Sequence, residues 1–231
     1  MQMEIKDVTQ SIFEILSNRI LTSQFKDGER LNENQLATEH NISRGPLREA
    51  FRLLEKEGLV RSIPRKGTFV KELHKRDIEE VFQIREMIEC FAIDLIVSNH
   101  LKDYHLQDTP LIALEDLPPQ AYEDPTRMLP ILMDNFRFHI SLVEASGNEM
   151  LVNFYQTITS ISARCQFKFP YSKENLERTH REHKELAALM RSEKYTEAKA
   201  YLKTHLHNAL ASLLNSYELE YSKQQAAGGQ A

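Results

Sequence analysis

Three histidines and one asparagine occupy positions where helical spacing calls for hydrophobic residues. Asn135 and His139 are four residues apart on one apolar helical stripe, and His183 and His205 interrupt the stripes of two later helices. A polar side chain on a buried face needs a partner. Neutral imidazoles that converge from several helices are typical ligands of a divalent metal. We therefore predict a site in which Asn135, His139, His183 and His205 hold a divalent cation such as Zn, Ni or Mn.

An arginine also points inward in this part of the chain. Arg85 lies in the stripe Ile78, Val81, Phe82, Ile88, where a hydrophobic residue is expected. A buried guanidinium beside a metal would pair with an anion, most simply a carboxylate. The pattern predicts a polar cavity that binds a small acid, such as a sugar acid or hydroxy acid.

A second group of residues has the chemistry needed to bind DNA. Arg44 and Arg48 are four residues apart, so they share one face near the start of a predicted helix. Either guanidinium can reach guanine O6 and N7, or a phosphate. Ser43, Gly45 and Pro46 shape this helix start, and Gly45 would let the backbone approach DNA. The turn Arg65-Lys66-Gly67 could contact the flanking backbone or minor groove.

The elements around these arginines predict a winged helix-turn-helix. A first helix carries Val8, Ile12 and Ile20, and a short helix follows at about 33–40. Ser43 is expected to cap a third helix that ends at Gly58. Alternation over 59–63 and 68–70 indicates two strands joined by a turn. We assign residues 1–73 to this DNA-binding domain.

The rest of the chain shows no strand alternation and is expected to form an all-α helical bundle. Helices are predicted at about 75–100, 109–117, 127–146, 148–168, 172–192 and 195–220. Residues 74–222 would form a ligand-sensing and dimerisation domain, and 223–231 a disordered tail. The predicted fold class is therefore mainly α, three helices and a β-hairpin wing followed by a bundle.

Charge and composition restrict the class of protein. The chain carries a net charge of −5, yet 44–71 hold eight Lys or Arg against three Glu. A basic segment on an acidic protein favours DNA binding. No apolar run is long enough to cross a membrane, and the polar N-terminus is not a signal peptide. Cys90 and Cys165 could pair, but buried thiols in a reducing cytoplasm fit their helical positions better.

Residues Leu31 to Val70 resemble the winged helix of the GntR family of bacterial regulators. The run Ser43 to Ala50 (SRGPLREA) and the ending Gly67-Thr68-Phe69-Val70 carry the resemblance. The family commonly places a DNA-contacting basic residue two positions before the leucine that matches Leu36. Here that position is Asn34, so a contact from it would differ in kind.

The helical part resembles the effector domain of the FadR-type branch of this family. Phe138-His139, Gly147-Asn148, His183 and His205 match its pattern, with Asn135 at the position of the usual metal-binding Asp. Arg85 and Glu89 resemble its Arg-x-x-x-Glu, and with Ser162 they form the expected effector-binding set. The resemblance implies a homodimer on a palindromic operator, controlled by a small effector.

Three alternatives remain at this point. A metal-dependent enzyme could use the histidines for catalytic zinc, although Glu89 is the only candidate general base. The chain could also be an architectural DNA-binding protein whose polar cavity holds only water and binds no ligand. Asn135 could instead mark a lineage that has lost the metal, so that the histidines bond an acid or water directly.

Overall fold

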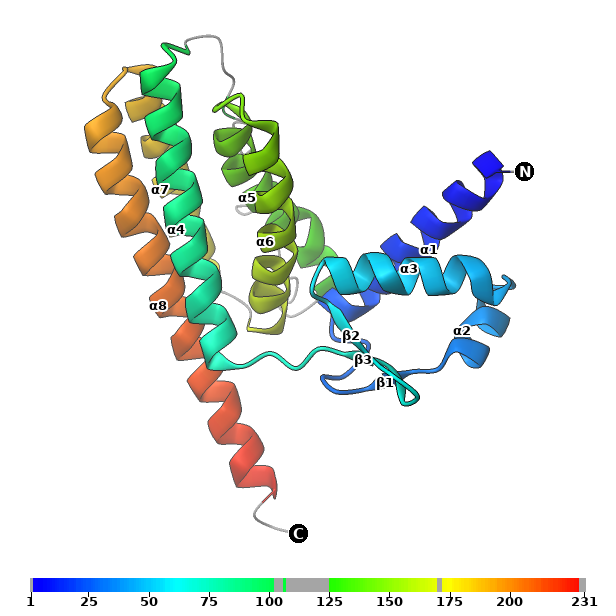
Figure 1. The fold of residues 1–231 in the computed structure, drawn as a ribbon. Coiled ribbons are helices and arrows are strands. Elements are labelled where there is room, and N and C mark those ends of the chain that lie inside the picture. The colour runs from blue at the N-terminus through cyan, green and yellow to red at the C-terminus, as the bar shows by residue number, and fades with distance from the viewer. Residues whose placement is uncertain (1, 102–105, 107–124, 170–171, 229–231) are drawn as a thin grey trace. The chain divides into compact units, whose positions relative to one another are not determined.

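The computed structural model describes residues 2–101, 106, 125–169 and 172–228. The chain divides into two compact units, Met1–Leu73 and His74–Ala231 (Figure 1). The helix predicted near 109–117 lies outside the described residues.

The first unit is a winged helix-turn-helix. Its helices are α1 (Gln2–Leu21), α2 (Glu33–Glu39) and α3 (Arg44–Lys56), and its strands are β1 (Arg30–Leu31), β2 (Val60–Ile63) and β3 (Gly67–Val70). The apolar stripes of α1 and α3 face each other and bury Leu16, Leu47 and Leu54 completely. This packing fixes α3 and leaves its polar face exposed.

The wing is a three-stranded antiparallel sheet in the order β1-β3-β2. The sequence predicted the β2–β3 hairpin but not β1, which is only two residues long and pairs Arg30 with Phe69. Two residues alone show no periodicity, so β1 depends on the edge that β3 offers. The β2–β3 turn needs positive φ at Arg65 (63°) and Gly67 (111°).

The two ends of α3 follow different rules. Gly58, with φ 69°, follows the C-cap, and the amide of Leu59 bonds to the carbonyl of Leu54 at 2.9 Å. Ser43 occupies the N-cap position, but its side chain makes no capping hydrogen bond. Ser43 is therefore the N-cap residue that the sequence predicted, and the residue is exposed.

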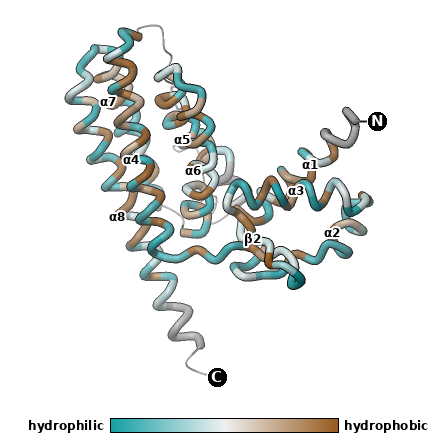
Figure 2. Tube along the Cα trace, viewed as in Figure 1, coloured by the Kyte–Doolittle hydropathy of each residue, from teal (hydrophilic) through white to brown (hydrophobic). Residues whose placement is uncertain are grey.

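The second unit is all helical among the described residues. It contains α4 (Lys75–Ser98), α5 (Pro125–Glu144), α6 (Glu149–Lys168), α7 (Lys173–Arg191) and α8 (Tyr195–Gly228). Helix α4 packs against α5, α6 and α8, and α7 packs against α8. Hydrophobic and hydrophilic stretches alternate along these helices (Figure 2), as expected where one face of each is buried.

Helix α8 continues to Gly228, into the segment 223–231 that composition predicted to be a disordered tail. Lys223, Gln224, Gln225, Ala226 and Ala227 are good helix formers, and no helix-breaking residue precedes Gly228. The sequence pattern ended the helix where the apolar stripe ends, whereas propensity extends it further. Cys90 and Cys165 are buried free thiols, as predicted.

Candidate functional site

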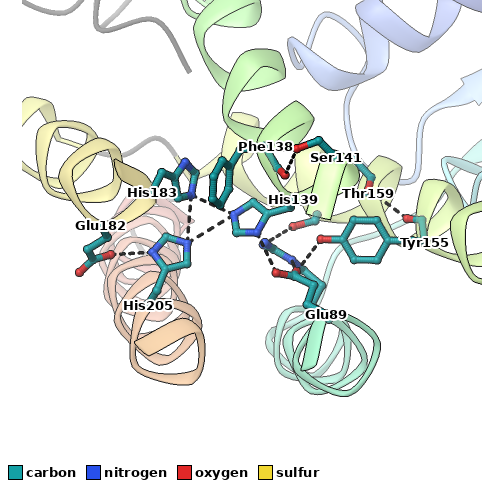
Figure 3. Close-up of polar contacts among 11 residues, drawn as sticks. Glu89, Phe138, His139, Ser141, Tyr155, Thr159, Glu182, His183 and His205 are labelled. Carbon is teal, nitrogen blue, oxygen red and sulfur yellow. Dashed lines mark hydrogen bonds and ion pairs between the residues drawn. The ribbon is translucent and has the colours of Figure 1, made fainter. Parts of the chain in front are cut away.

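Three histidines from three helices meet at one point inside the second unit. His139 comes from α5, His183 from α7 and His205 from α8, and each is at most 2% exposed. Their Nε2 atoms form a triangle, with His183 at 3.1 Å from His139 and 3.2 Å from His205, and 3.3 Å between the last two (Figure 3). The bundle therefore brings together all three histidines that the sequence singled out.

The size of this triangle suits a divalent metal. Imidazole nitrogens are common ligands of Zn²⁺ and similar divalent cations. His139, His183 and His205 would hold such an ion through their Nε2 atoms, and the ion would supply a positive charge that attracts an anion.

Two carboxylates orient two of the imidazoles. The Nδ1 atom of His139 lies 2.8 Å from Glu89, and that of His205 lies 2.6 Å from Glu182. A carboxylate bonded to Nδ1 fixes the proton there and leaves Nε2 with a lone pair. Asn208 donates to the other oxygen of Glu182 at 3.0 Å and holds that carboxylate in turn. The donor set therefore fits a metal.

The electrostatics keep the imidazoles of His139 and His183 neutral at pH 7. Burial, only partly offset by Glu89, lowers the pKa of His139 to about 4. Burial and the neighbouring His139 and His205 lower the pKa of His183 well below its usual range. Since only a neutral imidazole can ligate, both shifts favour cation binding near neutral pH.

Asn135 lies one turn before His139 on α5 and is 8% exposed. Its neighbour Asp134 ion-pairs with Arg137 at 2.6 Å and is partly exposed, so that carboxylate does not substitute for the one missing at Asn135. Position 135 therefore offers the cluster a neutral amide and no carboxylate.

Arg85, Glu89 and Ser162 form one buried network beside the histidines. The guanidinium of Arg85 donates from Nε to Glu89 at 3.0 Å and from Nη1 to Ser162 at 3.3 Å. Tyr155 donates its hydroxyl to Glu89 at 2.5 Å. Glu89 therefore bridges Arg85 and His139, through opposite oxygens of one carboxylate.

One polar atom of this network has no hydrogen-bond partner among the described residues. Nη2 of Arg85 is buried and bonds to none of the described residues, although the side chain is only 2% exposed. A buried unsatisfied donor on a cation costs free energy unless a ligand or water completes it. Both oxygens of Glu89, by contrast, are already engaged by protein groups.

The ionisation of this network follows from its contacts. Burial alone would raise the pKa of Glu89, but the interactions with His139 and Arg85 outweigh it and hold the pKa at about 2. Burial raises the pKa of the Tyr155 hydroxyl well above its usual range. At neutral pH this network therefore contains the Arg85 guanidinium, the Glu89 carboxylate and the neutral Tyr155 phenol.

The predicted DNA-binding residues lie on the first unit. Arg44 is exposed at the start of α3 and forms no ion pair with a described residue, whereas Arg48 pairs with Glu33 at 2.9 Å while staying 62% exposed. Asn34, Ser43 and Arg44 line one shallow pocket, with Gly45 and Pro46 following in the first turn of α3. The wing residues Arg65, Lys66 and Gly67 line a groove of about 740 Å³ together with Arg48.

The same groove contains cations that the sequence interpretation missed. Arg30 and Arg52 line it, beside Arg48, Arg65 and Lys66. A Cβ on Gly67 would lie 3.0 Å from Nε of Arg30, so the glycine makes room for that guanidinium against the wing. The sequence signal for Arg30 was weak, since it falls before the basic segment 44–71.

Glu182 and Tyr155 were also missed in the second unit. Glu182 precedes His183 by one residue, so helical geometry turns it away from the stripe, and it reaches His205 on the neighbouring helix instead. Tyr155 looked like an ordinary core aromatic. Neither role can be identified from spacing within one helix.

Comparison with known proteins gives a consistent answer for both units. Residues 8–70 match "Bacterial regulatory proteins, gntR family", and residues 80–208 match the "FCD domain". The chain is 30% identical over 196 residues to the HTH-type transcriptional regulator YdhC of Bacillus subtilis, covering 84% of this chain and 85% of the relative. It is 28% identical over 191 residues to the Nta operon transcriptional regulator of Aminobacter aminovorans, covering 82% and 87%.

Solved structures show the same fold. E. coli McbR/YncC aligns with a TM-score of 0.67 at 20% identity, covering 91% of this chain and 98% of that one. A transcriptional regulator from Rhodococcus sp. RHA1 aligns with a TM-score of 0.66 at 19% identity, covering 90% and 97%. No described helix is long and apolar enough to cross a membrane.

These matches confirm the predicted regulator and do not favour the enzyme alternative. The winged unit, with its basic groove, corresponds to the matched DNA-binding family, and the helical unit to the matched FCD domain. The chain therefore belongs to the GntR family of bacterial regulatory proteins, as a DNA-binding transcription regulator with an FCD domain.

Proposed function

We propose that a small carboxylate effector, bound in the helical unit, controls how this regulator binds its operator. The observation that carries the proposal is the unpartnered Nη2 atom of Arg85, which is buried and belongs to the network that reaches the histidines through Glu89. A carboxylate would complete its hydrogen bonds and balance its charge. Because the regulator would have to reach its operator DNA, we place it in the cytoplasm.

We further propose that His139, His183 and His205 hold a divalent metal, with Asn135 as a weak fourth ligand. The support is the triangle of Nε2 atoms and the two carboxylates behind it. The metal would act as a Lewis acid that attracts an anion. Because Asn135 brings no charge, a bound effector carboxylate would balance more of the cation's charge.

Metal content and ligand response test both proposals together. Protein purified without a chelator or metal-affinity tag should contain about one metal per chain, and Asn135→Asp should bind it more tightly because a charged ligand is restored. Hydroxy acids should raise the melting temperature most when the metal is present. Arg85→Ala should lose the response to the acid and keep the response to the metal.

Two results would contradict these expectations in different ways. A metal-free protein, with no metal uptake by either the native chain or Asn135→Asp, would refute the proposed metal site. An Arg85→Ala variant that still responds fully to hydroxy acids would refute the proposed anion site at Arg85.

On DNA, we propose that Arg44 and Arg48 read base edges while the wing binds phosphates. Arg44 forms no ion pair with a described residue and stands at the N-terminal end of α3, the part of a recognition helix that enters the major groove. Arg30 would add a phosphate contact beside Lys66, since it lines the same groove and forms no ion pair with a described residue. It would supply a cation near Asn34, where the family usually has one.

We also propose a homodimer that binds a palindromic operator, because one winged helix reads only a few base pairs. A stripe of α4 supports this. Ile84, Met87 and Phe91 share one face and are 37%, 65% and 48% exposed, while Arg85 and Glu89 lie on the other side of the same helix. A second copy of this stripe would cover it in a two-fold arrangement.

A charge in the middle of this stripe should break the dimer. Phe91→Asp should raise the dimer dissociation constant at least about tenfold, since a carboxylate would be buried among apolar groups. Sedimentation at micromolar concentration measures this. Asn215→Asp, which adds the same charge at an exposed position of α8, should leave the dimer intact. A Phe91→Asp variant as dimeric as the native chain would place the interface elsewhere.

A further inference from the structure

The third histidine of the cluster is held differently from the other two. His139 and His205 each have a carboxylate at Nδ1, but no described residue hydrogen bonds to Nδ1 of His183. Instead, the imidazole of His183 lies flat against the ring of Phe138, with 4.1 Å between ring centroids and 13° between planes (Figure 3).

From this stacking we propose that Phe138 is the positioning residue for His183 as a metal ligand. The inference rests on the proposed metal site. Phe138 is 1% exposed, so its ring is itself fixed by the packing around α5. The ring of His139 makes an edge-to-face contact with the imidazole of His183, with 84° between the planes and 4.7 Å between the centroids. These two contacts define both the plane and the rotation of the His183 imidazole.

Two neighbouring residues of α5 would therefore serve the metal site in different ways. His139 supplies one ligand, and the residue just before it orients a second ligand that comes from α7. An imidazole held by a ring face keeps its plane but gains none of the basicity that a carboxylate would add. His183 is therefore the ligand whose binding depends most on orientation.

Replacing the aromatic ring of Phe138 should weaken metal binding, while an apolar side chain still fills the core. Phe138→Leu should lower the affinity for added Zn or Mn about 10- to 100-fold, the range found when a residue that orients a ligand is lost. The matched control is Phe136→Leu, because Phe136 lies on the same helix, is also 1% exposed, and stacks on no histidine among the described residues. We expect Phe136→Leu to keep the affinity within about threefold, since no ligand is disturbed.

The measurements are calorimetric titration of the metal-free, full-length protein and the visible absorption of its Co(II) form, which reports ligand geometry. Phe138→Leu should change the absorption bands, whereas Phe136→Leu should not. Phe138→Tyr, which keeps the ring, should restore the native bands. If Phe138→Leu fails to fold, Phe138→Met, which fills the same space without a flat ring, should show the same loss.

The outcomes separate the inference from the proposed function. Equal weakening by both leucine variants would show a general packing effect and overturn the role of Phe138. Native-like affinity and bands in Phe138→Leu would overturn it while leaving the metal site standing. A native protein that takes up no metal would remove the metal site and this inference with it.

Discussion

A chain carrying both Arg44→Ala and Arg48→Ala is expected to lose nearly all specific operator binding while folding normally. Neither side chain supports the core, since both are exposed on α3. Each bidentate contact to a guanine contributes about 1–3 kcal/mol of discrimination, so the pair should cost roughly 30- to 20,000-fold in affinity. Titration of operator DNA at fixed salt measures this, and an undiminished affinity would refute the assignment.

Arg61→Ala is the matched control for this experiment. Arg61 is an exposed wing-strand arginine that pairs with Glu72 at 3.7 Å and is absent from the groove lining. The phosphate-binding cations should behave in a third way. Arg30→Ala and Lys66→Ala should each weaken binding about equally on all sequences and reduce the salt slope by about 1. A sequence-dependent loss in Arg30→Ala would instead indicate a contact inside the minor groove.

Glu89→Gln is expected to destabilise the helical unit severely. Its carboxylate is fully buried and bridges Arg85, Tyr155 and His139, so the change leaves a buried guanidinium without a counter-charge. Breaking a buried pair in this way costs about 3–5 kcal/mol. Urea titration of the metal-free, full-length protein, followed by circular dichroism, measures the free energy of unfolding.

The same helix provides a control with the same spacing. Arg76 and Glu80 also form an i,i+4 pair, at 2.6 Å, but their side chains are 85% and 50% exposed. Glu80→Gln should cost at most about 0.5 kcal/mol. Similar losses in the two variants would show that the bridge at Glu89 contributes no more than a surface pair.

The pH dependence of stability should follow from the same carboxylate. The pKa of Glu89 is about 2 in the folded chain, below its usual 4.5. A lowered pKa stabilises the folded state above the unfolded-state value. The contribution of Glu89 should therefore be complete above about pH 5 and fall as the pH drops from 4.5 toward 2.

Local patterns in the sequence were sufficient for the fold and for the inward residues. Apolar periodicity placed the described helices to within a few residues, except for the C-terminal end of α8, and Gly58 and the Arg65–Gly67 turn set the ends of α3 and the wing. Three polar breaks in three apolar stripes identified His139, His183 and His205. A buried polar residue stands out against its stripe even when its partner is unknown.

Contacts between helices could not be predicted in this way. Glu182 faces away from the stripe of its own helix and reaches His205 on the next, and Phe138 resembles any core aromatic until His183 is placed against it. Arg30 gains its position from a two-residue strand that exists only because β3 offers an edge. These relations depend on tertiary packing, which a single sequence does not display.

Under the proposed effector control, helix α4 would also act as a mechanical lever. Its 24 residues span about 36 Å, and only His74 separates it from the end of the first unit at Leu73. A tilt of about 5° displaces one end of such a rod by about 3 Å relative to the other, close to the 3.4 Å step between base pairs. A shift of about 1–2 Å at Arg85, near the middle of the rod, would then correspond to a displacement of about 3 Å at its end, the scale at which DNA is read.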